Sequence, residues 1–251
     1  GTATHGDICN IVVSNSVVED SQGGIGIFER DGGTVQSLHF ANLVIETAAV
    51  HAGRAEWPIV VDLKRRDENS KAGRIEGVTF SAIRIHSSGK LLFSGMTSHP
   101  IRDLHLAGIS VNAVPPKSPV EQTQRPRKSP LDSVAGEDET AAALLFGYVA
   151  DSSVSDLRVA WPAESASLDR HAFFVHSVDG LSFDGVTARQ GKVGGQRAAL
   201  HFLASRNIEI RNSTAPRQTG VWIEAQGISK QEFFFAGNNT AAAYRDVVYV
   251  K

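Results

Sequence analysis

The sequence predicts an all-β protein built as a parallel β-helix, a solenoid whose rungs are about 26 residues long. The first observation behind this prediction is a set of short runs in which apolar residues alternate with polar or small ones, as at residues 25–28 and 38–40. Alternation at period two is typical of a β-strand. Strands this short need stacked neighbours, because a few residues do not form a stable sheet alone.

The second observation is that one run, which ends in a small or polar corner, recurs along the chain. Its first apolar positions are 11, 38, 78, 104, 157, 181 and 208, so the spacings are 27, 40, 26, 53, 24 and 27 residues. We interpret the spacing of 40 as one period with an insertion and the spacing of 53 as close to two periods. Repeats of about 20 to 50 residues indicate solenoids, propellers or arrays.

The third observation is a second series of apolar runs that keeps step with the first, at residues 25–28, 59–63, 91–93, 144–146, 173–175, 200–202, 221–223 and 247–250. A propeller blade needs about 40 residues and four strands, which is more than each unit holds. Leucine-rich repeats are the alternative, but their Leu-x-x-Leu-x-Leu spacing and helical segments are missing. A β-helix, in which each strand pairs with its copy one rung away, is therefore favoured.

Composition limits the classes of function. The chain has 251 residues, 41% of them hydrophobic, which is enough for one solenoid domain over residues 1–251. A net charge of −2 gives no global field that favours nucleic acid or an anionic membrane. No apolar run approaches the roughly 20 residues of a membrane span. Cys9 is the only cysteine, so no intrachain disulfide is expected, and we predict a buried small hydrophobe.

Two segments interrupt the repeat in ways that bear on binding. Residues 64–71 form a charged loop, either a solvated turn or a basic lip that meets an anionic ligand. Residues 113–140 hold five prolines, many charges and few apolar side chains. We predict a long surface loop there, because such a segment cannot bury enough surface to fold alone.

The first rungs carry a resemblance to a known family. Gly1-Thr2 is followed by Asn-Ile-Val-Val-Ser-Asn at residues 10–15 and Gly-Ile-Gly-Ile-Phe at residues 24–28. This order resembles glycoside hydrolase family 28, the polygalacturonases and rhamnogalacturonases, in which the catalytic histidine is followed by Gly-Ser, an Asn-Val-Thr-Val strand ending in Asn, and Gly-Ile-Arg-Ile-Lys. The rungs after Ile59 look like the C-terminal part of the same family. The resemblance implies a right-handed parallel β-helix, a secreted or periplasmic protein, and a pectic or other acidic polysaccharide as substrate.

The chain also departs from this family. The family's catalytic residues lie in Asn-Thr-Asp, Asp-Asp and Gly-His-Gly motifs, and none of these occurs in the chain. The Arg and Lys that bind uronate carboxylates in the family fall on Gly26 and Phe28. The resemblance therefore implies either a fragment that lacks the catalytic half or a natural short form with another role.

Candidate site residues come from outward positions of the second series, which stacking would align as Phe28, Asp62, Ser94, Gly147, His176, Leu203 and Glu224. Asp62 is the candidate catalytic carboxylate, and Glu29 and Asp31 could approach it as the second carboxylate that glycosidases need. Arg30 and Lys64 are candidate ligands for uronate carboxylates, with Phe28 as an apolar floor.

A second cluster is expected near the C-terminal end. His201 and Trp222 occupy a neighbouring column, beside His176 and Glu224. Trp222 could be a platform for a sugar ring, while His201 and Glu224 could bind its hydroxyls; packing against a loop is the alternative. No His, Cys or Asp grouping has the spacing of a metal site, so no metal or cofactor is predicted.

The leading functional hypothesis is a family 28-like hydrolase that acts on an acidic polysaccharide or oligosaccharide. The alternative is a non-catalytic carbohydrate-binding or structural β-helix, which the missing motifs favour. A third class, polysaccharide lyase, would by family resemblance need an Arg or Lys base and usually Ca²⁺. Because a solenoid end exposes unpaired backbone and apolar core, we also predict a homo-oligomer formed through the N-terminal rung, unless residues 1–7 fold over that end as a cap.

Overall fold

The computed structural model describes residues 5–48, 56–116 and 142–250. Within these ranges the regular structure is β-strand, apart from two short 3₁₀ helices, η4 (Ala163–Ser165) and η5 (Lys230–Glu232). The all-β class predicted from the alternating runs is confirmed. In the same ranges, no helix is long and apolar enough to cross a membrane.

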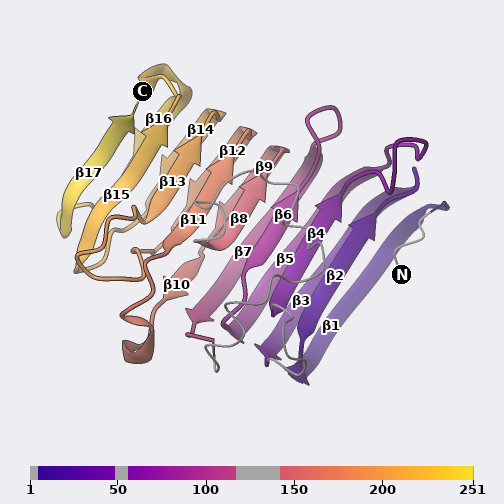
Figure 1. Ribbon diagram of the computed structural model, residues 1–251, viewed down its shortest axis with the longest axis horizontal. Helices are drawn as coiled ribbons and strands as arrows, with labels where there is room; N and C mark the ends of the chain where they lie inside the picture. Colours follow the sequence, from indigo (N-terminus) through magenta and orange to yellow (C-terminus); the bar gives the residue numbers. More distant parts are fainter. Residues whose placement is uncertain (1–4, 49–55, 117–141, 251) are drawn as a thin grey trace.

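The described strands form two parallel sheets, and the chain alternates between them (Figure 1). The first sheet has nine strands in the described ranges: β1 (Ile8–Ser21), β3 (Thr34–Thr47), β5 (Arg74–Ser87), β7 (Ile101–Ala113), β9 (Val149–Ser155), β10 (Arg158–Ala160), β12 (Asp179–Asp184), β14 (Arg206–Arg211) and β16 (Phe233–Ala236). The second has eight: β2 (Gly23–Glu29), β4 (Trp57–Leu63), β6 (Leu91–Ser94), β8 (Ala142–Gly147), β11 (His171–His176), β13 (Leu200–Leu203), β15 (Thr219–Gln226) and β17 (Ala243–Val250).

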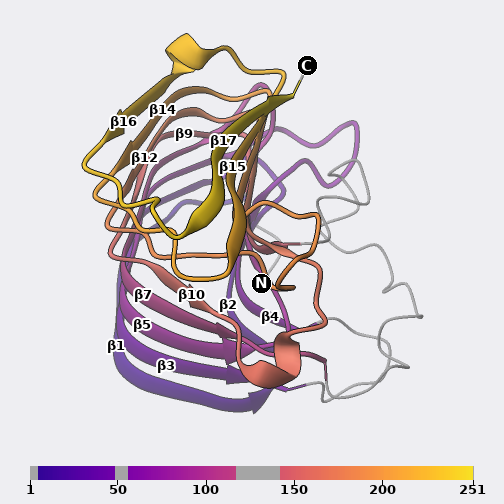
Figure 2. The ribbon, with the colours of Figure 1, turned by 90° about the vertical axis from the view of Figure 1, so that its left-hand side faces the viewer.

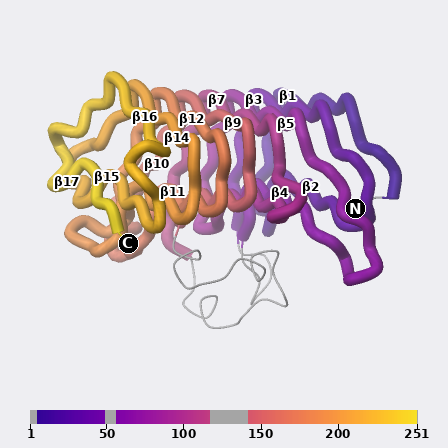
Figure 3. The backbone as a smooth tube through the Cα atoms, turned by 90° about the horizontal axis from the view of Figure 1, so that it is seen from above, coloured from indigo at the N-terminus to yellow at the C-terminus, as the bar shows by residue number. Residues whose placement is uncertain are grey.

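The two sheets face each other, as the end view in Figure 2 shows. Successive passes of the chain lie side by side along the long axis, from the N-terminal to the C-terminal end (Figure 3). Each strand pairs with the next strand of the same sheet, as β1 with β3 and β2 with β4. The short strand β10 is the exception, because it pairs with β7. We call one pass through both sheets a rung.

The register confirms most of the predicted repeat. In the first sheet, Ile11 lies beside Leu38, Leu38 beside Val78, and Val78 beside Leu104. The second series is aligned from Ile25 beside Ile59 to Phe173 beside Leu200. On β15 it is shifted by two residues, because Ile223, not Val221, lies beside Leu200 and Val247.

One position of the first series is wrong. The next partner on β9 is Ser152, beside Leu181, whereas Leu157 lies outside that register. The spacing of 53 residues is therefore not two periods, because β7 pairs directly with β9 and β6 with β8. The spacing of 53 residues corresponds to one rung that contains an inserted segment.

Left-handed corners explain why small and polar residues end each run. Asn15, Asn42, Ala82 and Gly108 have φ between 52° and 64° and bend the long strands of the first sheet at equivalent places. Asn and Gly tolerate this conformation better than other residues. The corner asparagines also stack, because the Asn42 side-chain amide donates to Asn15 Oδ1 at 2.6 Å. The same residue type at the same corner thus stabilises both the bend and the rung contact.

A single buried core fills the space between the sheets, running from Ile27 near one end to Phe233 near the other. Aromatic side chains stack from rung to rung inside it: the ring centroids of Phe40 and Phe80 are 5.1 Å apart and those of Phe93 and Phe146 are 4.9 Å apart. Stacked aromatic pairs add to the stabilisation that area burial gives.

The N-terminal rung exposes apolar side chains. Val12 is 71% exposed and Val17 is 61% exposed on β1, which pairs on one side only with β3. Cys9 lies on the same strand and is exposed, so its predicted burial is wrong; no rung of the described chain covers it.

The predicted N-terminal cap and the predicted surface loop at residues 113–140 lie partly outside the described residues. Residues 1–4 of the expected N-terminal cap lie outside them, while Asp7 accepts a hydrogen bond from the Thr34 backbone at 2.9 Å. Most of the predicted surface loop, residues 117–140, lies outside them too. Self-association through the first rung stays a prediction.

The core stack gives a stability prediction. Phe146 is fully buried between Phe93 and Phe173, so Phe146→Ala should lower the free energy of unfolding by about 3–5 kcal/mol. Phe234→Ala is the matched control, because Phe234 is 51% exposed and should lose about 0.5 kcal/mol or less. Urea denaturation measures both, and equal losses would contradict the stacked core.

Candidate functional site

The predicted acidic-sugar site around Asp62 is a buried ion-pair cluster. Asp62 is 1% exposed and lies beside Phe28 on the neighbouring strand. Arg30 is 7% exposed, and its guanidinium forms an ion pair with the Asp62 carboxylate. It also donates to the backbone oxygens of Asp62 at 2.7 Å and Glu29 at 2.9 Å. Lys64 is more remote, with its ammonium 3.9 Å from Asp62 Oδ2.

Burial and two nearby cations act in opposite directions on the Asp62 carboxyl. Desolvation raises the pKa of its carboxyl, and the charges of Arg30 and Lys64 oppose that rise. Asp62 Oδ1 is buried without a hydrogen-bond partner. Arg30 stacks over the Phe28 ring, with 5.5 Å between Cζ and the ring centroid. The structure thus brings Phe28, Arg30, Asp62 and Lys64 together, as predicted, but their contacts are with one another.

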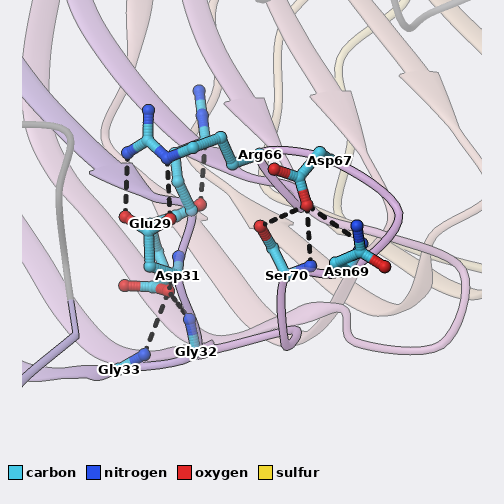
Figure 4. A network of polar contacts seen from close by, with 9 residues as sticks. Glu29, Asp31, Gly32, Gly33, Arg66, Asp67, Asn69 and Ser70 are labelled. Atoms are coloured by element: carbon cyan, nitrogen blue, oxygen red, sulfur yellow. Dashed lines mark hydrogen bonds and ion pairs between the residues drawn. The ribbon is translucent and has the colours of Figure 1, made fainter.

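The expected carboxylate partners of Asp62 have other contacts. Glu29 Oε1 accepts hydrogen bonds from the backbone amides of Asp31, Gly32 and Gly33 at 2.9, 2.7 and 3.1 Å (Figure 4). The Asp31 carboxylate receives two hydrogen bonds from Arg66, at 2.7 and 2.8 Å. Both acids therefore organise the turn after β2 and do not form a pair with Asp62.

The charged loop at residues 64–71 is an ordered polar turn. Asp67 Oδ1 accepts from the amides of Asn69 and Ser70 and from the Ser70 hydroxyl, each at 2.9 Å (Figure 4). These bonds, the Ser70 hydroxyl first, lower the pKa of the Asp67 carboxyl. With Arg66 bound to Asp31, the geometry favours the solvated turn over a basic lip.

The predicted C-terminal cluster has a different register. Glu224 lies beside His201, and Gln226, not Glu224, lies beside Leu203. Trp222 is 2% exposed and packs in the core between the sheets, so it offers no platform to a sugar. Alternation alone placed Trp222 outward, but its strand begins at Thr219 and the indole turns into the core.

The histidines of this cluster are buried. His201 is 3% exposed, with Nε2 3.8 Å from Glu224 Oε1. Sequence reasoning missed His171, whose Nε2 lies 3.4 Å from His201 Nδ1 and whose Nδ1 donates to the Ala198 carbonyl at 2.8 Å. Because these rings bind one another and the backbone, their arrangement favours packing, the alternative left open by the sequence.

His176 lies over a glycine. A Cβ at Gly147 would come within 2.2 Å of His176 Nε2, so only glycine leaves room for this ring. Tyr148 packs its ring edge-on against His176, with centroids 5.2 Å apart. Burial without a partner at Nε2 lowers the pKa of His176 to about 4.

One concave surface of the described chain is a groove that sequence reasoning missed. It has a volume of about 830 Å³ and lies where the chain turns from the second sheet into the first. Its floor holds the corner residues Tyr148, Ser177 and Ala204, which have φ of 51°, 53° and 47°. Two longer connections, residues 95–100 after β6 and 227–232 after β15, line its ends. We call it the corner groove.

The corner groove crosses several rungs. The strands that lead into it are neighbours in the order β6, β8, β11, β13 and β15. Four strand spacings make about 19 Å from end to end. The sequence could have indicated the corner groove through position in the repeat. The residue directly after a strand of the second series lines the groove in four rungs: Tyr148, Ser177, Ala204 and Gly227.

Neither metal ligation nor known relatives identify this site. Among the described residues, no group of three or more His, Cys, Asp or Glu side chains could hold a metal ion. Comparisons with protein-family models, curated proteins and solved structures found no match for this chain.

The ion-pair cluster gives a second stability prediction. Arg30→Ala should lower the free energy of unfolding by about 3–5 kcal/mol, because it leaves the Asp62 carboxylate buried without its closest cation. Lys64→Ala should cost about 1 kcal/mol or less, since Lys64 is 35% exposed and 3.9 Å away. Chemical denaturation distinguishes the two. Small, equal losses would show that Arg30 is available for a ligand, as the sequence suggested.

His176 predicts an acid sensitivity. Its pKa falls from an ordinary 6.5 to about 4 in the folded chain, so protons bind the unfolded chain more tightly. The stabilisation is present above about pH 6.5 and is lost as the pH falls through 4, by up to about 3 kcal/mol.

His176→Leu should therefore flatten the decline in unfolding free energy between pH 7 and 4, measured by denaturation at each pH. His39→Gln is the control for loss of a histidine, because His39 is exposed on β3. An unchanged slope in His176→Leu would contradict the assignment.

Proposed function

We propose that the two sheets are faces of a right-handed parallel β-helix, and that this chain binds a polysaccharide without cleaving it. The alternation of the chain between two parallel sheets, with rungs in near-constant register, supports the solenoid. Solenoids present long grooves that suit extended ligands. The corner groove is the observation that carries the binding proposal.

The lining of the corner groove suits hydroxyl-rich ligands. The hydroxyls of Tyr148, Ser177 and Ser229 line it and make no hydrogen bond to another described residue. Carbohydrate binding uses such groups, together with an apolar or aromatic surface and a few charges. Here the Tyr148 ring and the side chains of Met96 and Ile228 supply the apolar part.

The hydrolase hypothesis has weaker support. A raised pKa, as at Asp62, is what a general acid needs. Hydrolysis usually needs a second carboxylate about 5 to 10 Å away, and Glu29 and Asp31 are held by other groups.

The acids of the corner groove do not supply the missing pair either. Arg206 and then Asn207 hold the pKa of the Asp179 carboxyl below its usual range, the opposite of what an acid catalyst requires. Asp179 and Glu232 share Asn207 as a hydrogen-bond donor, at 2.7 and 3.1 Å, which fits a positioning role. Binding without cleavage is therefore the function that we propose.

Binding is tested by titration calorimetry against a panel of plant cell-wall tetrasaccharides, both neutral and acidic. Tyr148→Ala should weaken binding of the best ligand about tenfold or more, through loss of ring contact and hydroxyl. Tyr148→Phe keeps the packing on His176 and should lose about threefold to tenfold through the hydroxyl alone. Tyr244→Ala is the control, since Tyr244 is 82% exposed on β17.

Three results would contradict the proposal. They are no binding by the wild-type chain, equal binding by all variants, and release of reducing ends from the bound glycan. The last would favour the hydrolase.

A further inference from the structure

The charges that line the corner groove balance one another. Among the described residues, its lining has two cations, Arg102 and Arg206, and two anions, Asp179 and Glu232. Asp151 lies beside it as the ion-pair partner of Arg102. The groove therefore carries no excess of positive charge that would attract a polyanion.

Stacking places these charges in one column. Arg102, Ala150, Asp179 and Arg206 are successive partners at the start of strands β7, β9, β12 and β14. Adjacent members are about 4.8 Å apart. Ala150 is the only short side chain of the four, so it leaves space between the first cation and the anion. A ligand that lies along the rungs meets positive, neutral, negative and positive positions in turn.

Each cation of the column already has an anionic partner. Arg206 contacts Asp179 Oδ2 at 2.7 Å, and Arg102 forms an ion pair with Asp151. Asn207 donates to Asp179 Oδ1 at 2.7 Å, and its backbone amide donates to Glu232 Oε2 at 3.1 Å. These contacts hold the Asp179 and Glu232 carboxylates of the groove lining in place.

A polyuronate would meet these carboxylates at close range. To bind the arginines, the uronate carboxylates must displace Asp151 from Arg102 and Asp179 from Arg206. Other uronates of the same polysaccharide then face the carboxylates of Asp179 and Glu232. Like charges brought together cost binding energy and are a common means of rejecting a wrong partner. Sugar hydroxyls can donate to the carboxylates and accept from the arginines, so an uncharged glycan meets no such penalty.

We propose that the corner groove selects an uncharged, hydroxyl-rich glycan over polyuronates. This inference rests on the proposed function and narrows its ligand class. It departs from the acidic polysaccharide that the sequence suggested, which depended on Arg30 and Lys64. The structure keeps Arg30 bound to Asp62 in a separate cluster.

The test compares tetragalacturonate with neutral tetrasaccharides of galactose, glucose, xylose and arabinose by titration calorimetry. At least one neutral ligand should bind the wild-type chain about tenfold or more tightly than tetragalacturonate. Its affinity should change less than about twofold between 0.05 and 0.5 M NaCl, because screening weakens charge attraction and leaves neutral contacts nearly unchanged. Tyr148→Phe should weaken the same ligand, which places it in the corner groove.

A pair of charge-neutralising substitutions should give a gain of binding. Asp179→Asn with Glu232→Gln keeps the shape and many hydrogen bonds but removes both anions of the lining. This variant should bind tetragalacturonate about tenfold more tightly than the wild-type chain, and salt should weaken that binding. Glu19→Gln with Asp246→Asn changes net charge equally at exposed sites outside the lining and should gain nothing.

The outcomes separate this inference from the proposed function. Preference of the wild-type chain for tetragalacturonate, with binding that falls as salt rises, would overturn the inference and leave glycan binding standing. The same holds if the Asp179 and Glu232 variant gains no affinity for tetragalacturonate. Failure of every tetrasaccharide, neutral and acidic, would overturn the proposed function itself.

Discussion

Backbone pairing between successive rungs is the constraint on which the rest of the structure depends. Each strand satisfies its amides and carbonyls with the equivalent strand one rung away, as β3 does between β1 and β5. A slip of one residue would send every core side chain to the opposite face. Equivalent residues must therefore stack, and this produces the phenylalanine column through Phe93 and Phe146 and the asparagine contact between Asn15 and Asn42.

The same constraint decides where the chain can vary. Insertions cannot enter a strand without breaking the register, so they lie at corners between strands. Two such connections, after β6 and β15, line the ends of the corner groove, and the tight corners at Tyr148, Ser177 and Ala204 form its floor. The groove is thus a consequence of unequal connection lengths on a regular scaffold, a common origin of binding sites.

Stacking also decides which charges a ligand can reach. Arg30 and Asp62 occupy neighbouring rungs and are buried, so each is the strongest available partner of the other. Arg102 and Arg206 have 51% and 67% exposed side chains, and their ion pairs lie in solvent. Exposed pairs of this kind contribute little to stability, so their charges can serve recognition, whereas the buried pair serves the fold.

The sequence by itself determined the all-β class, most of the second strand series and the small or polar corners that end the runs, because alternation and turn composition are local properties. The repeat also predicted correctly that four residues lie close together, because it fixes which residues stack: Phe28, Arg30, Asp62 and Lys64. It misplaced Leu157, Trp222 and Glu224, where a strand starts early or an insertion shifts the register. Only the tertiary structure decided which side chains are buried and that a groove lies over the corners. Burial and concavity depend on how distant segments pack, and no local pattern encodes that.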